Sequence, residues 1–198
     1  MLPTSAYSYT DEKIKLLASW QDSDGTIKVV ILNEAGISED KIDIIKKVIT
    51  SDVSYKVNGQ TYFEGWNGVL DAISTDKVKR FEISESKNYT SSDIIIKLLK
   101  ESNPEYNGLT KPIFAGNHVI SATIRIFAAD SLSSSQLENL IRHEFGHAMG
   151  LGHSTYEGSM MYPIMPSSTE KYISECDMEG LKATHVGETF VDMQCTQI

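Results

Sequence analysis

The sequence predicts an α+β fold in which helices pack against a mixed, mostly parallel, twisted sheet. Short apolar runs, typical of buried strands, alternate along the chain with segments whose apolar residues recur at helical spacing. No linker rich in proline or glycine divides the 198 residues. We therefore expect one domain over residues 1–198, built around one hydrophobic core.

The first part of the chain alternates strand and helix. TIKVVIL (26–32) is rich in β-branched residues and predicts a buried strand. A turn over 33–36 leads to a helix from Ser38, because acidic residues fill its first turn and KIDIIKKVI has helical spacing. Beyond Gly59, YFEGWNGVLDAI (62–73) predicts a second helical segment.

The middle of the chain is typical of strands. FEIS (81–84) and DIIIKLL (93–99) predict two further strands, and NPEYNG (103–108) predicts a turn. HVISATIRIF (118–127) alternates well enough to form one or two strands.

A helix with clear signals follows the serine-rich stretch 131–135. The spacing predicts Ser135 as its N-cap, with Glu138 reaching back to complete a capping box. Its apolar residues recur at core spacing, so one face should pack on the sheet and the histidines should lie outside that face: Leu137, Leu140, Ile141, Phe145 and Ala148.

Charge and hydropathy exclude several classes of partner. The formal net charge is -9 and the pI about 5.0, which argues against nucleic-acid and anionic-membrane surfaces. No apolar run approaches the roughly 18–20 residues that span a bilayer. We expect a monomer whose partners are neutral or basic polypeptides.

The expected location is secreted or cell-surface. The N-terminus lacks the basic-then-apolar layout of a secretory signal. Either the protein stays inside the cell or a leader or pro-segment has been removed, and we favour removal. Cys176 and Cys195 suggest one disulfide and an oxidising compartment, with two free thiols as the alternative.

Two further motifs give weaker evidence of function. Asn88-Tyr89-Thr90 fits a glycosylation sequon. Asp22-Ser23-Asp24-Gly25 is similar to part of a calcium loop but lacks the downstream bidentate glutamate of an EF-hand, so Ca²⁺ is possible but unsupported.

HEFGHAMGLGH (143–153) predicts a metal site. His143 and His147 are four residues apart and share one side of a helix, whereas Glu144 projects beside them. A continuous helix would carry His153 onto another face, so the chain must reverse at Gly150. Three imidazoles would then bind one ion and leave a fourth position open, which is typical of catalytic zinc.

HExxHxxGxxH is the zinc signature of the metzincin metallopeptidases. Met161, eight residues after the third histidine, resembles the methionine turn of the matrixins within that group, and Ser154, directly after that histidine, also resembles the matrixins. ISECDMEGLKATHVG (173–187) is similar to the C-terminal helix of matrixin catalytic domains, and Asp177 matches the acidic residue that anchors it beneath the methionine turn.

The resemblance implies a zinc endopeptidase with a zincin-like fold, comprising an N-terminal subdomain (1–153) and a small C-terminal subdomain (154–198). It implies one catalytic zinc, Glu144 as general base, Met161 as an apolar plug beneath the metal, and a polypeptide substrate lying along a strand edge within 112–120. The substrate-binding residues that it implies are Asn139, Pro163, Ile164 and Met165.

A second, structural zinc is not expected, because only His118 and His185 remain and they lie far apart in the sequence. His118 is expected at a strand edge or in a loop. Two other functions stay open: a metal-dependent amidase acting on a non-protein substrate, and a zinc-bearing binding module that has lost catalysis.

Overall fold

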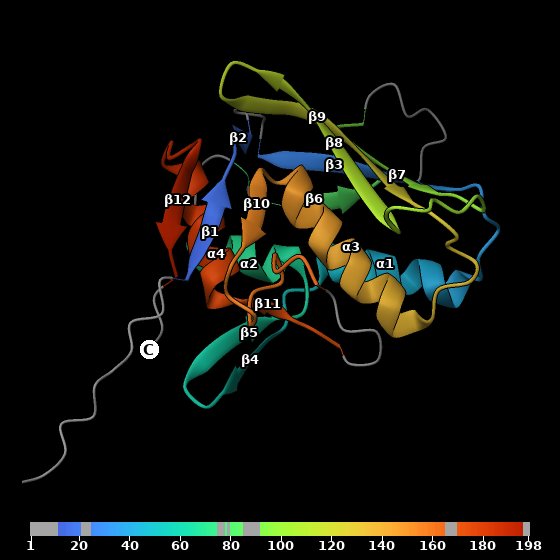
Figure 1. Ribbon diagram of the computed structural model, residues 1–198, viewed down its shortest axis with the longest axis horizontal. Helices are drawn as coiled ribbons and strands as arrows, with labels where there is room; N and C mark the ends of the chain where they lie inside the picture. The colour runs from blue at the N-terminus through green and yellow to red at the C-terminus, as the bar shows by residue number, and fades with distance from the viewer. Residues whose placement is uncertain are drawn as a thin grey trace, which may run out of the picture.

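The computed structural model describes residues 12–20, 25–74, 78, 80–84, 92–164 and 170–195. Figure 1 shows the chain coloured from its N-terminus to its C-terminus. The helices are α1 (Glu39–Thr50), α2 (Trp66–Ile73), α3 (Ser134–Ala148) and α4 (Glu175–His185). The strands are β1 (Lys13–Leu16), β2 (Ser19–Trp20), β3 (Thr26–Asn33), β4 (Ser54–Val57), β5 (Gln60–Phe63), β6 (Arg80–Ile83), β7 (Ile94–Leu98), β8 (Gly108–Ala115), β9 (His118–Ile126), β10 (Leu151–Ser154), β11 (Ile173–Ser174) and β12 (Val191–Gln194).

The main sheet has the order β2-β9-β7-β3-β6, and β8 pairs with β9. Every pair in the ordered path is parallel, whereas β8 runs antiparallel to β9. This confirms the mixed, mostly parallel sheet. β3 and β7 could be recognised from the sequence because both are rich in β-branched residues, although their side chains alternate between buried and more exposed positions along much of each strand.

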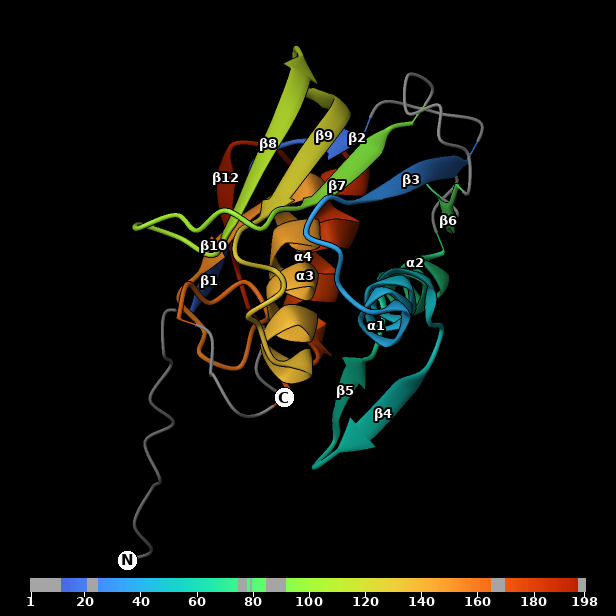
Figure 2. The ribbon, with the colours of Figure 1, turned by 90° about the vertical axis from the view of Figure 1, so that its right-hand side faces the viewer.

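Helices α1 and α3 lie side by side under one face of this sheet (Figure 2). Phe145 on α3 packs edge-on against Phe81 on β6, with ring centroids 4.9 Å apart. The apolar residues expected on the core face of α3 are buried there, with Leu140 half-buried, and His143 and Glu144, which lie outside that set, are buried as well. The chain after α3 continues as β10, which pairs with β1 rather than with the main sheet.

A small antiparallel sheet, β10-β1-β12, joins the two ends of the described chain. A disulfide between Cys176, in the first turn of α4, and Cys195, directly after β12, closes this arrangement. The disulfide confirms the pairing that the two cysteines suggested and excludes the alternative of free thiols.

The expected helix over 62–73 is only partly right. β5 ends at Phe63 and α2 begins at Trp66, with Gly65 as its N-cap. Gly65 is required there, since a Cβ would lie 2.7 Å from the carbonyl oxygen of Ser51. The first residues of the segment pair instead with β4 in a hairpin, which helical spacing alone could not reveal.

The predicted N-cap of α3 is wrong by two residues. Ser133, not Ser135, is the N-cap, and it forms the capping box with Gln136. Glu138 does not reach back; it pairs with the fully buried Arg142 one turn later. A buried guanidinium needs a charged partner, so this pair takes precedence over the cap.

Three motifs fall outside the described residues: Asp22 to Asp24, the sequon at Asn88, and Met165. The division between residues 153 and 154 stays a prediction. β10 crosses that boundary and pairs with β1, so the two proposed subdomains share a sheet.

Candidate metal centre

His143 and His147 lie one turn apart near the C-terminal end of α3. Their Nε2 atoms are 3.1 Å apart, and the ring centroids are 4.6 Å apart. The Nδ1 atom of His143 lies 2.9 Å from the carbonyl oxygen of Met160, and that of His147 lies 2.8 Å from the carbonyl oxygen of Leu151. A carbonyl only accepts, so each Nδ1 carries the proton and each Nε2 presents its lone pair.

The chain reverses at Gly150, as the spacing predicted. α3 ends at Ala148, and Gly150 has a φ of +91°, in the left-handed region. Its carbonyl oxygen accepts from the backbone N–H groups of Leu17 and Ala18 at the end of β1. A Cβ at position 150 would lie 2.9 Å from the carbonyl carbon of Ala18, so only glycine fits this turn.

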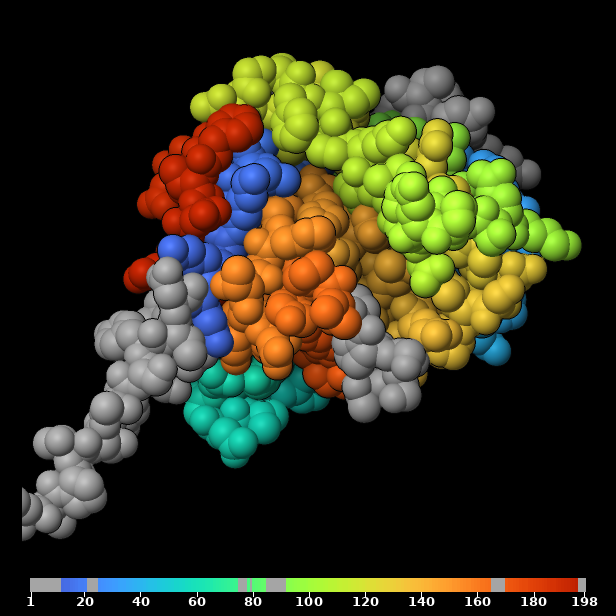
Figure 3. Space-filling view, viewed as in Figure 1, coloured from blue at the N-terminus to red at the C-terminus, as the bar shows by residue number. Residues whose placement is uncertain are grey.

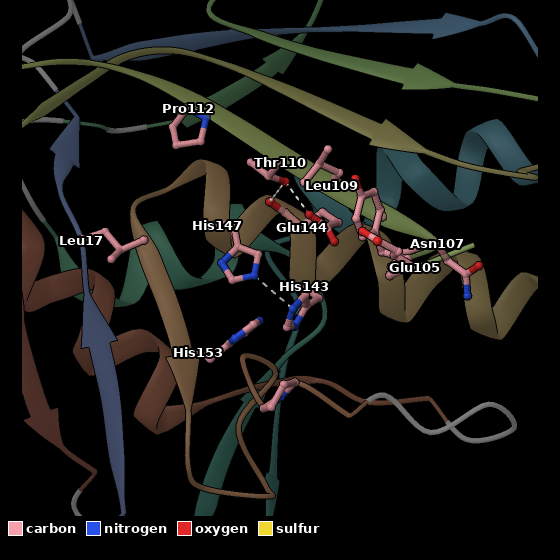
Figure 4. A pocket seen from close by; sticks show the side chains of 14 residues that line it. Leu17, Glu105, Asn107, Leu109, Thr110, Pro112, His143, Glu144, His147 and His153 are labelled. Carbon is pink, nitrogen blue, oxygen red and sulfur yellow. Dashed lines mark hydrogen bonds between the residues drawn. The ribbon is translucent and has the colours of Figure 1, made fainter. Parts of the chain in front are cut away.

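β10 then returns His153 to the two helical histidines. The ring centroid of His153 lies 5.4 Å from that of His143 and 4.9 Å from that of His147. One nitrogen from each of the three rings lies within 4.8 Å of the other two. Among the described residues, these three histidines are the group of side chains close enough together to bind one metal ion. Figure 4 shows the three rings gathered at one side of the cleft.

The donor set fits zinc. Burial lowers the pKa of His143 to about 4 and that of His147 to about 3, so both rings are neutral at pH 7. His153 is more exposed, and partial loss of contact with water also lowers its pKa. Neutral imidazole is the form that binds metals, and two lone pairs 3.1 Å apart repel each other unless a cation binds both.

Met160 and Met161 lie next to the part of α3 that carries the two helical histidines. Met161 is fully buried, and its side chain fills the space where a Cβ on Gly146 of α3 would stand. The carboxylate of Asp177 on α4 accepts from the backbone N–H groups of Met160 and Met161 at 2.8 and 3.3 Å. This confirms that Asp177 anchors α4 beneath the turn, and Met160 in turn supports His143.

Glu144 projects from α3 toward β8. The hydroxyl of Thr110 lies 2.6 Å from its Oε2 atom and 2.9 Å from its carbonyl oxygen. Burial raises the pKa of Glu144 to about 7, while the hydrogen bond from Thr110 acts in the opposite direction. Gly108 leaves room for the carboxylate, because a Cβ there would lie 2.8 Å from both Cγ and Cδ of Glu144.

A cleft of about 610 Å³ opens over these residues. In Figure 3 it follows the furrow between the yellow-green β8 region and the orange segment after α3. The cleft is lined by Leu17, Glu105, Tyr106, Asn107, Gly108, Leu109, Thr110, Pro112, Leu140, His143, Glu144, His147, His153 and Pro163.

The proposed substrate-binding residues lie in different places. Pro163 lines the cleft, and Ile164 is exposed beside it. Asn139 does not line the cleft; it is buried in α3, and its Oδ1 atom accepts from the backbone N–H of Lys171 at 2.8 Å.

Part of the expected edge, residues 112–115, belongs to β8, and Pro112 lines the cleft. The range 112–120 crosses a hairpin turn: Gly116, at φ +62°, reverses the chain between β8 and β9. The strand that lines the cleft is β8, which begins at Gly108, within the predicted turn 103–108. Thr110 and Gly108 were missed as site residues, because no local motif connects them with Glu144, which lies more than 30 positions later.

The two remaining histidines lie apart from this centre. His118 is the first residue of β9 and pairs with Ser19 of β2 and Ala115 of β8, so it lies at the end of an inner strand, and its Nδ1 atom lies 3.0 Å from the hydroxyl of Ser19. His185 ends α4 and donates from Nδ1 to the carbonyl of Leu181. Within the described part of the chain, no helix combines the length and apolar character needed to cross a bilayer.

Comparisons with known proteins agree with this geometry. Over 56 residues the chain is 43% identical to interstitial collagenase of Bos taurus, an alignment that covers 27% of this chain and 12% of that protein. It is 36% identical over 67 residues to metalloendoproteinase 2-MMP of Arabidopsis thaliana, covering 33% and 18%. Metalloendoproteinase 1-MMP of Arabidopsis thaliana is 24% identical over 209 positions, covering 84% and 56%.

The chain thus spans between 12% and 56% of the length of these three relatives. A family model described as matrixin matches residues 18–186, which is most of the chain and includes the three histidines, Gly150 and Met161. The chain therefore belongs to the matrixin family.

Proposed function

We propose that the protein is a zinc-dependent endopeptidase in which His143, His147 and His153 hold the zinc and Glu144 is the general base. The observation that carries the proposal is the convergence of three imidazoles beside a buried carboxylate in an open cleft. The matrixin family, to which the chain belongs, supports the same activity.

Bound zinc supplies a Lewis acid that polarises the scissile carbonyl and lowers the pKa of water. Glu144 accepts the proton from the attacking water and afterwards donates it to the departing amine. Burial raises the pKa of this carboxyl to about 7, which suits a group that both takes and returns a proton near neutrality. The Met160 and Leu151 carbonyls keep two imidazoles oriented throughout.

The substrate is proposed to be a polypeptide that adds as a strand to the edge of β8 that pairs with no other strand among the described residues. β8 pairs with β9 on one side, and its residues Gly108 to Thr110 line the cleft on the other. An antiparallel substrate strand would place its N-terminal part toward Ala115. Pro112 lacks a backbone N–H, so the substrate must lose one hydrogen bond there. Pro163, Ile164, Met165 and Asn139 stay proposals for the specificity pocket.

We also propose that the protein acts as a monomer outside the cytosol. The disulfide between Cys176 and Cys195 supports an oxidising compartment, because reducing compartments keep such pairs as thiols.

Replacing the base tests the proposal. Glu144→Gln keeps the shape of the side chain but cannot accept the proton, so we expect peptide hydrolysis to fall at least about 10²-fold while bound zinc is retained. Glu101→Gln, an exposed residue outside the cleft, serves as the matched control. Full activity of Glu144→Gln would contradict the proposal, as would hydrolysis of small amides without hydrolysis of peptides.

A further inference from the structure

The carboxylate of Glu144 is held between two residues of β8. On one side the hydroxyl of Thr110 donates to Oε2 at 2.6 Å. On the other side Oε1 occupies the space that a Cβ on Gly108 would fill. Among the described residues, Thr110 provides the side-chain hydrogen bond that we find for this carboxylate, and Oε1 has none.

This arrangement leaves the two oxygens with different environments. Oε2 accepts the hydrogen bond of the hydroxyl, whereas Oε1 lies against Gly108 and accepts none among the described residues, so it keeps its lone pairs for a proton. A general base must be held within hydrogen-bond reach of the proton that it takes, and small displacements reduce the rate strongly. A glutamate has three rotatable bonds, so something must fix it.

We propose that Thr110 and Gly108 form a seat that fixes the Glu144 carboxylate for catalysis, so that both are positioning residues of the reaction. The inference rests on the proposed function. Both residues also belong to the strand edge on which the substrate is proposed to pair. The same backbone would therefore set the position of the substrate and that of the base.

A purely structural role for Thr110 makes a different prediction. Its hydroxyl also lies 2.9 Å from the carbonyl oxygen of Glu144, so it could simply tie β8 to α3. Such a tie would affect stability and zinc retention. If Thr110 instead positions the Glu144 carboxylate, its loss should lower kcat, and the effect should depend on the hydroxyl group itself.

The test compares kcat, KM and bound zinc in variants of the whole protein. Thr110→Val removes the hydroxyl but keeps the shape, and we expect kcat to fall about 10-fold or more with KM and zinc content unchanged. Thr110→Ser keeps the hydroxyl and should retain kcat within about 3-fold. Gly108→Ala should lower kcat by pushing the carboxylate away, and a crystal structure of that variant should show the displacement.

Two controls make the same substitutions nearby. Thr123→Val changes the residue of β9 that lies opposite Lys111. Gly116→Ala changes the hairpin turn, where nothing lies within 4 Å of an added Cβ, so the left-handed φ of +62° should reduce stability but leave kcat unchanged. If Thr110→Val does not fold, Thr110→Ala replaces it in the comparison with Thr110→Ser.

The outcomes separate the seat from the proposed function. Wild-type kcat in Thr110→Val, or equal losses in Thr110→Val and Thr110→Ser, would overturn the seat while an inactive Glu144→Gln still supports the base. An active Glu144→Gln would overturn the base itself, whatever the Thr110 variants do.

Discussion

The two sides of the metal centre are built differently. His143 and His147 sit on a buried helix, and each donates from Nδ1 to a backbone carbonyl. His153 sits on a short strand and is exposed, and we find no hydrogen bond to its ring among the described residues. The helical pair is therefore held by side-chain contacts, whereas His153 depends on where the backbone of β10 runs.

That backbone is fixed by contacts far away in the sequence. β10 pairs with β1, β1 pairs with β12, and β12 ends at the disulfide to α4. Gly150 joins α3 to β10 and contacts the end of β1. Two of the three ligands are therefore positioned by a helix of the hydrophobic core, whereas the third depends on the small sheet β10-β1-β12.

The largest expected effect is that of Gly150→Ala. The substitution forces a side chain into the left-handed region and into the carbonyl of Ala18, so we expect a loss of roughly 4 kcal/mol in unfolding free energy. Zinc affinity should fall as well, because β10 can no longer present His153. Chemical denaturation and chelator competition measure the two quantities; unchanged zinc affinity would show that His153 does not depend on this turn.

Removing the disulfide should have the next largest effect. Cys176 and Cys195 are 19 residues apart, so Cys176→Ser with Cys195→Ser should lower the unfolding free energy by about 3 kcal/mol. Hydrogen exchange should increase in β12, β1 and β10 more than in α3. Equal increases in α3 and β10 would contradict the division between the two sides of the centre.

The third largest effect is expected when His147 and His153 are replaced in turn. In the metal-free protein, His147→Ala should lower the unfolding free energy by about 2 kcal/mol, because it leaves the carbonyl of Leu151 without its partner. His153→Ala should change it by less than about 0.5 kcal/mol, since the side chain is exposed. Both should weaken zinc binding. Thermal unfolding in the presence of a chelator measures the stability of the two variants, and zinc titration measures their affinity for the metal. Equal losses of stability in His147→Ala and His153→Ala would contradict the difference between the two sides of the centre.

The smallest effect on zinc binding and activity is expected for Met161→Leu. The side chain is an apolar plug against Gly146, and a similar volume should cost less than about 1.5 kcal/mol. Zinc content and peptide hydrolysis should remain near wild type. A loss of zinc would show that the sulfur of Met161 takes a more direct part in the site.

The helical side of the centre could be predicted from sequence because its determinants are local. Spacing of four residues places His143 and His147 together, and a glycine at 150 marks the reversal. The terminal sheet could not be predicted in this way. β1 and β10 are four residues each, and their pairing joins Ile14 to Ser154, a contact that no local pattern contains.

Other differences have the same origin. Ser133 and Ser135 are equivalent as local helix starts, and the choice depends on the buried pair of Glu138 with Arg142. Thr110 and Glu144 meet only because β8 lies over α3, and Pro112 and Lys111 interrupt the strand pattern of β8. The residues that could not be predicted are therefore those whose roles depend on contacts between segments far apart in the sequence.

A crystal structure of the zinc-loaded protein is the most direct test of the proposed zinc site. We expect the Nε2 atoms of His143, His147 and His153 at about 2.0–2.1 Å from one zinc ion, with both Nδ1 hydrogen bonds retained and no fourth protein ligand. A zinc ion bound by the two helical histidines with His153 turned away, or a fourth side chain bound to the metal, would contradict it.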